Sequence, residues 1–142
     1  MSDLQRFKEA QEQDFELALE EIRGGCKRSH WMWYIFPQIR GLGFSSMSAY
    51  YGIQDLKEAE DFLKDPYLGG NLRRICQALL ELDTDDPHRI FGSPDDLKLR
   101  SSMTLFEAAE GKGGIFTKVI EKYYGGRRDQ RTLELLGITP VF

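Results

Sequence analysis

The chain has 142 residues, of which 41% are hydrophobic and 30% are charged, and this is the composition of a folded domain, not of a disordered chain. Its formal net charge of −4 argues against a nucleic-acid partner, because neutralising a phosphate backbone requires clustered lysines and arginines. We therefore expect a single domain, residues 1–142, with enough buried surface to fold by itself.

The beginning of the chain lacks a basic region followed by an apolar run, and no stretch reaches the ~18 apolar residues of a membrane span. We therefore expect a cytoplasmic protein with no membrane partner. Cys26 and Cys76 have no second Cys or His at ligand spacing beside them. The sequence thus predicts two free thiols, no metal site and no cofactor.

Residues 3–23 carry apolar side chains at three- and four-residue steps between acidic residues, which predicts a surface helix. Ser2 and Gln5 have the spacing of a capping box at its start, and two glycines follow its end. Residues 29–38 are apolar on every side, and we interpret them as a short buried helix that ends near Pro37. The glycines and serines of residues 41–48 predict a loop.

The second half of the chain has stronger helical signals. Asp55 is placed to cap a helix, and residues 68–82 keep a strict apolar rhythm of three and four. Asp86 and Ser93 each precede a proline suited to a first helical turn, and Asp129 begins the last predicted helix. No segment alternates with period two. The predicted fold class is therefore all-α, a compact multihelical single domain of about six or seven helices.

An aromatic run contains both tryptophans of the chain, Trp31 and Trp33, together with Tyr34. Large aromatic side chains at this density favour a core in the first place. The alternative is a pocket wall that stacks a flat ligand, with His30 and Gln38 as the polar groups that orient it. His30 is also the natural candidate for a general base near neutral pH, although a packed and hydrogen-bonded histidine is the more common outcome.

A second candidate segment is the predicted helix that contains Lys98, Ser101, Ser102 and Thr104. Lys98 and Ser101 lie three residues apart, so they share a helix face and are candidates for a Ser-Lys pair in acyl transfer. The usual order of that motif is reversed here. The alternatives are an anion-binding Lys98, or small hydroxyl side chains that simply allow close helix packing.

The third candidate is the glycine and arginine turn at residues 125–131, where Arg128 is placed to grip an anion in a bidentate way. Asp129, as the predicted cap, would occupy the same backbone amides. A solvated basic turn is therefore the alternative interpretation.

Several of these motifs together resemble one known family. They are the run at residues 29–38, residues 90–92, Asp96 with Lys98, residues 101–106, and Asp129 with Thr132. The chain resembles the bacterial domain of unknown function 1810 family, some of whose members are labelled calpastatin. The resemblance implies a compact multihelical cytoplasmic domain and brings no established reaction. Calpain inhibitors of the calpastatin kind are disordered, whereas this composition is that of a folded domain.

A further likeness is to the helical N-glycosidases associated with NAD and ADP-ribose, through an aromatic segment and a Ser-rich helix start at Ser45 and Ser46. That superfamily has a Glu directly after its serine pair, where this chain has Met47. The resemblance therefore carries over no catalytic residue.

Three hypotheses about function follow. The leading one is a small-molecule pocket for an anionic or nucleotide-like ligand, with or without catalysis, whose binding residues are His30, Trp31, Trp33, Tyr34, Gln38, Lys98, Ser101, Thr104 and Arg128. The second is a non-catalytic protein interaction module, monomer or homodimer, that offers an apolar edge of the helix at residues 3–23. The third is an N-glycosidase-like enzyme linked to nucleotides or ADP-ribose.

Overall fold

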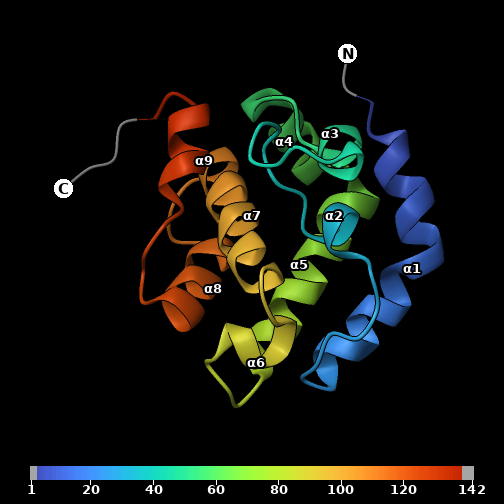
Figure 1. Ribbon diagram of the computed structural model, residues 1–142, viewed down its shortest axis with the longest axis vertical. Coiled ribbons are helices and arrows are strands. Elements are labelled where there is room, and N and C mark those ends of the chain that lie inside the picture. Colours follow the sequence, from blue (N-terminus) through green and yellow to red (C-terminus); the bar gives the residue numbers. More distant parts are fainter. Residues whose placement is uncertain (1–2, 139–142) are drawn as a thin grey trace.

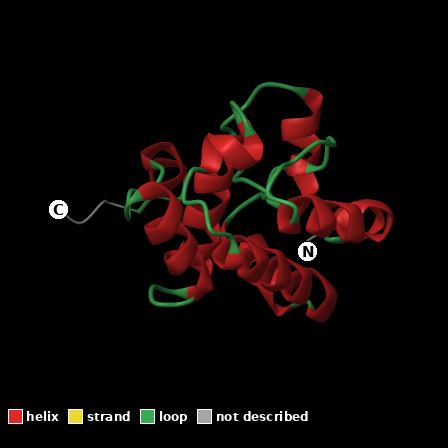
Figure 2. Cartoon of the chain, turned by 90° about the horizontal axis from the view of Figure 1, so that it is seen from below, coloured by secondary structure: helices red, strands yellow, loops and turns green. Residues whose placement is uncertain are grey.

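The structure is a computed structural model that describes residues 3–138, and within this range it contains helices and loops but no strand (Figure 2). The all-α prediction is confirmed, but the described part has nine helices and not six or seven, and five of them have seven or more residues. The difference lies in short helices of one or two turns. The helices are α1 (Gln5–Arg23), α2 (Met32–Ile35), α3 (Ser46–Tyr51), α4 (Leu56–Lys64), α5 (Pro66–Glu81), α6 (Pro87–Phe91), α7 (Asp95–Glu110), α8 (Ile115–Tyr124) and α9 (Gln130–Leu135).

Helices α5 and α7 organise the packing (Figure 1). Helix α5 packs against α1, α4 and α8, whereas α7 packs against α4, α6, α8 and α9. The buried apolar side chains form one cluster, which runs from Phe7 of α1 to Tyr124 of α8. Every long helix therefore contributes to the same core. Among the short helices, α6 and α9 pack against α7, whereas α2 packs against α1 and α3.

Local capping explains where most of these helices begin and end. As predicted, the carboxylate of Asp55 accepts the Glu58 N–H at 2.9 Å, and that of Asp86 accepts the His88 N–H at 3.0 Å. Asp129 caps α9 in the same way by accepting the Thr132 N–H. Helix α8 ends at Tyr124 and is followed by the C-cap residue Gly125. The backbone of Gly125 is left-handed, with φ of +62°, and only glycine adopts this conformation without steric strain.

Two predicted boundaries are wrong, and a third lies outside the described residues. Ser93 does not cap α7, because Pro94 occupies the N-cap position and no side chain caps this helix. The segment predicted as a loop at residues 41–48 turns helical at Ser46, since the Ser45 side chain accepts the Ser48 N–H at 3.1 Å. Ser2, the predicted cap of the first helix, lies outside the described residues, and α1 begins at Gln5.

The apolar face of α1 packs inside the protein. Phe7, Phe15 and Leu19 are buried against the rest of the chain, and the large apolar side chain that α1 exposes within residues 3–138 is Leu17, at 43%. No helix in this part of the chain combines the length and the apolar character that a bilayer crossing demands.

Residues 39–52 form a loop that contains α3 and is closed at its base by backbone hydrogen bonds. Its two ends are tied together, because the Ile53 N–H donates to Gln38 O and the Arg40 N–H donates to Ile53 O, both at 2.8 Å. This parallel bridge between Ile39 and Ile53 is isolated and begins no sheet. Its effect is to hold the residues just before and just after this loop, Gln38 and Ile53, next to each other.

The turn from α1 to α2 is organised by the carboxylate of Glu21. This carboxylate accepts N–H groups from Arg28 at 2.8 Å and Ser29 at 3.0 Å, the Ser29 hydroxyl at 2.6 Å and the Trp31 indole N–H at 2.9 Å. Burial opposes ionisation, but the four hydrogen bonds outweigh it and lower the pKa of Glu21 from 4.5 to about 2.

This lowered pKa predicts a pH-dependent stability. A carboxylate whose folded-state pKa lies below the unfolded value stabilises the fold above pH 4.5, and that contribution disappears as the pH falls towards 2. We expect Glu21→Gln to lower the free energy of unfolding by about 1–2 kcal/mol at pH 7, after allowance for solvent screening, and to have little effect near pH 2. Urea denaturation at a series of pH values measures this difference.

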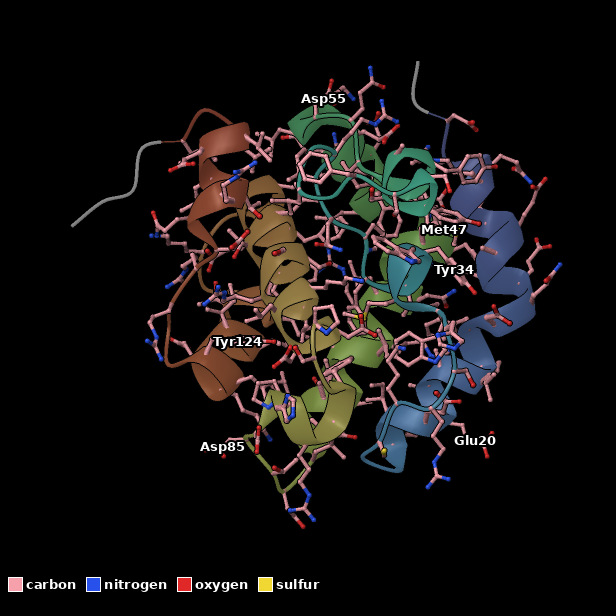
Figure 3. The ribbon with its side chains drawn as sticks, viewed as in Figure 1. Glu20, Tyr34, Met47, Asp55, Asp85 and Tyr124 are labelled. Atoms are coloured by element: carbon pink, nitrogen blue, oxygen red, sulfur yellow. The ribbon has the colours of Figure 1, made fainter. Side chains whose placement is uncertain are left out.

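Glu20→Gln is the matched control. Glu20 is the neighbouring residue, its side chain is exposed (Figure 3), and this side chain makes no hydrogen bond to any residue between 3 and 138. Its replacement is expected to leave the pH profile of stability unchanged. A Glu21→Gln variant with the same profile as wild type would contradict the assigned role of this carboxylate.

Candidate functional site

Three segments that are distant in sequence enclose a cavity of about 260 Å³. They are residues 33–52, the start of α7 and the start of α9. We call this hollow the Trp33 cavity. Its apolar lining comprises Trp33, Ile39, Leu42, Tyr51, Pro94 and Leu97, and its polar lining comprises Gln38, Ser48, Lys98, Ser101, Asp129 and Arg131. The aromatic run and the Lys98 helix therefore meet around an open space.

Trp33 forms the aromatic wall of this cavity. It is half-buried on the one-turn helix α2, and the Lys98 ammonium lies 4.0 Å from the centre of its ring. This is a cation–π contact, and Lys98 also pairs with Asp95 at 3.3 Å. An aromatic face and a positive charge thus border the same small volume.

Ser101 forms the polar edge where α7 meets α9. Its hydroxyl lies 3.1 Å from the carboxylate of Asp129 and 3.2 Å from the carbonyl oxygen of Leu97. The same carboxylate accepts the Thr132 N–H at 3.2 Å and the Thr132 hydroxyl at 2.5 Å. The hydroxyl of Ser101 is therefore directed to Asp129 and Leu97, whereas Lys98 is engaged with Asp95 and Trp33.

Thr104 lies beneath this edge and not at the cavity surface. Its side chain is buried, donates to Arg100 O at 2.8 Å and accepts the Asp129 N–H at 3.0 Å. Thr104 thus fixes the start of α9 against α7. It positions the lining residue Asp129 and does not itself border the Trp33 cavity.

The other aromatic candidates point elsewhere. Trp31 is fully buried and packs against Phe36 and Phe91, and His30 is exposed outside the cavity. Tyr34 lies on the α1 side of α2 (Figure 3), where its hydroxyl hydrogen-bonds to Asp14. Burial, together with this carboxylate, raises the pKa of Tyr34. Within this one-turn helix and its N-cap, Trp31 therefore faces the core, Tyr34 faces α1, and Trp33 faces the cavity.

Arg128 lies at a second, neighbouring hollow. Its guanidinium donates to both carboxylate oxygens of Glu107, at 2.9 and 2.6 Å. Burial acts to raise the pKa of Glu107, but hydrogen bonds from Arg128 and Thr117 hold it below its usual value. Of the predicted binding residues, Trp33, Gln38, Lys98 and Ser101 border the Trp33 cavity, whereas Arg128 borders the neighbouring one.

Sequence reasoning missed several lining residues. The candidates do not include Tyr51; Arg131 is named only as part of the turn at residues 125–131, and Asp129 only as a helix cap and in the motif with Thr132. The cap spacing of Asp129 and Thr132 was visible in the sequence, but it gave no sign that α9 would begin beside Ser101. Within residues 3–138, no group of three or more His, Cys, Asp or Glu side chains is arranged to hold a metal ion.

Comparison with known proteins places the chain in a family. Residues 1–136 match the sequence family described as "Protein of unknown function (DUF1810)". The chain belongs to the DUF1810 family. It is also similar to the conserved hypothetical protein Rv1873 from Mycobacterium tuberculosis, known from a crystal structure, with 45% sequence identity, a TM-score of 0.93, and coverage of 96% of this chain and 98% of that one. No curated protein matches the chain.

The sequence motifs that resemble the DUF1810 family meet at the Trp33 cavity. Residues 29–38 contribute Trp33 and Gln38, and the segment around residues 96–106 contributes Lys98 and Ser101. Asp129, of the motif that pairs it with Thr132, completes the edge between α7 and α9. In this DUF1810 protein, several of these motifs therefore contribute residues to the cavity, and residues 39–52 add to its lining.

Proposed function

We propose that this protein binds a small planar organic molecule, anionic or nucleotide-like, in the Trp33 cavity. The observation that carries the proposal is the position of the Lys98 ammonium, 4.0 Å from the centre of the Trp33 ring at the wall of a cavity. Ligand pockets commonly combine aromatic walls with a few convergent polar groups, and their volumes begin at about 300 Å³. A cavity of about 260 Å³ suits a single ring system.

The polar groups around the cavity favour an anionic ligand. Lys98 and Arg131 are cations, while Gln38 and Ser101 supply neutral hydrogen-bonding groups. Asp129 is the acidic lining residue, and its carboxylate is occupied by Thr132 and Ser101. The ring would lie against Trp33 while its negative charge faces Lys98. Both cysteines are free, which supports the reducing cytoplasm as the proposed location.

Tryptophan fluorescence tests the proposal directly. Because Trp31 is fully buried, Trp33 is the indole that a ligand would contact. We expect one or more compounds of a nucleotide and metabolite library to change the emission of the wild-type protein, and Trp33→Phe to abolish the change. Lys98→Met should weaken binding by about tenfold or more, because an ion-paired hydrogen bond contributes roughly 1.5–3 kcal/mol.

Lys118→Met is the matched control, since Lys118 is exposed on α8 and does not border the cavity. It should bind every compound as wild type does. A compound that binds Trp33→Phe and Lys98→Met as tightly as wild type would place its site elsewhere. The proposal would be refuted if no compound of the library bound the wild-type protein in either the fluorescence or the calorimetric measurement.

A further inference from the structure

A second cavity, of about 600 Å³, lies beside the first, between α7, the turn before α8, and α9 with the segment that leads into it. We call it the Arg128 cavity. Its charged lining consists of five cationic side chains, Arg100, Lys112, Arg127, Arg128 and Arg131, and two carboxylates, Glu107 and Asp129. The lining is therefore positively charged, although the formal net charge of the whole chain is −4. Such local concentration of cations is the electrostatic signature of a polyanion site.

Arg128 is held in a fixed orientation within this cavity. Its Nε and Nη2 donate to Glu107, and its Nη1 donates to Gly126 O at 2.7 Å. Glu107 is itself buried at 5% exposure and is anchored by the Thr117 hydroxyl at 2.5 Å. The guanidinium is therefore preorganised, and its remaining N–H groups are available to a ligand.

The other arginines keep hydrogen-bonding capacity that the described chain does not use. Arg100 forms a long ion pair with Asp129, at 3.8 Å, and its Nε is buried without any acceptor in the described chain. Arg127 and Arg131 are exposed, and neither has an acidic partner among residues 3–138. Several guanidinium groups that lack acceptors suit a ligand that carries more than one negative charge, such as a phosphoryl group.

The two cavities share Asp129 and Arg131 in their linings and are therefore neighbours. We infer that the Arg128 cavity binds the phosphoryl part of a nucleoside-phosphate-type ligand whose planar ring occupies the Trp33 cavity. This inference rests on the proposed function for the position of the ring. The anion site itself depends only on the arginine cluster.

Calorimetric titration with inorganic pyrophosphate, adenosine and ADP separates the two parts. The decisive variant is Lys112→Gln combined with Arg127→Gln, because both side chains are exposed and make no hydrogen bond that the fold needs. We expect its affinity for pyrophosphate and for ADP to fall by about tenfold or more, with adenosine binding unchanged. Trp33→Phe should weaken adenosine and ADP and leave pyrophosphate unchanged.

The matched control is Arg23→Gln combined with Lys64→Gln, which removes the same amount of charge from exposed positions on α1 and α4. The inference is supported if pyrophosphate binds the control with the affinity of the wild-type protein and binds the Lys112 and Arg127 double variant weakly. Equal losses in both variants, or no pyrophosphate binding to wild type, overturn it. Pyrophosphate binding without any adenosine response would leave the anion site standing and refute the ring position in the Trp33 cavity.

Discussion

Replacement of Arg6 by Met is expected to lower the free energy of unfolding by about 3–5 kcal/mol, because it leaves a buried carboxylate without its partner. Arg6 Nη2 lies 2.9 Å from Glu58 Oε1, and the two side chains are only 6% and 3% exposed. Without Arg6, the described hydrogen bond that remains to this carboxylate comes from the Gln54 N–H. Met keeps most of the apolar part of the arginine side chain. The loss of stability therefore measures the contribution of the Arg6 charge and its hydrogen bonds.

The same arginine links α1 to the wall of the Trp33 cavity. It donates to Tyr50 O at 2.8 Å and to Gly52 O at 3.0 Å, at the end of the loop formed by residues 39–52. Gly52 and the adjacent Tyr51 line the cavity. We therefore expect Arg6→Met to weaken ligand binding as well as the fold, although Arg6 does not border the Trp33 cavity.

Urea denaturation followed by circular dichroism measures this effect, and Lys57→Met provides the comparison. Lys57 pairs with Asp61 on the surface of α4, with its side chain 68% exposed, and ion pairs of this kind contribute little to stability. The urea midpoint of the Lys57→Met variant should equal that of the wild-type protein. Equal midpoints for the Arg6 and Lys57 variants would refute the structural role of the buried pair.

A second large effect is expected where α4 and α5 meet. A Cβ atom at Gly69 would lie 2.2 Å from the carbonyl oxygen of Leu63 and 2.9 Å from its carbonyl carbon. Backbone atoms cannot swing aside as a flexible side chain can, so the two helices would have to separate. We expect Gly69→Ala to destabilise the protein by about 1–3 kcal/mol or more.

Gly70→Ala is the opposite case on the next residue of the same helix. Nothing lies within 4 Å of a Cβ atom at Gly70, and this position is exposed. Alanine should therefore stabilise α5 by about 0.5–1 kcal/mol through its better helix propensity. Thermal and urea unfolding of both variants should show shifts of opposite sign. Two shifts of the same sign would mean that α4 and α5 do not approach as closely as described.

Local sequence signals account for the helices themselves. Asp55, Asp86 and Asp129 act as N-caps because a cap needs only backbone N–H groups two or three residues away. The rhythm of residues 68–82 predicted α5 because one face of that helix is buried throughout. Ser93 failed as a cap since Pro94 takes the N-cap position of α7, a backbone placement that cap spacing does not reveal.

Composition and periodicity determined an all-α chain, most of its long helices and the segments from which a pocket would be built. Only the tertiary structure decided which side chain of each segment faces the pocket. The run of residues 29–38 is apolar on every side, so no periodicity could separate Trp33, which meets Lys98, from Trp31, which is buried in the core. The approach of Asp129 to Ser101 likewise depends on how α9 packs on α7. Contacts between residues distant in sequence arise from the packing of whole helices, so the local pattern of apolar residues cannot predict them.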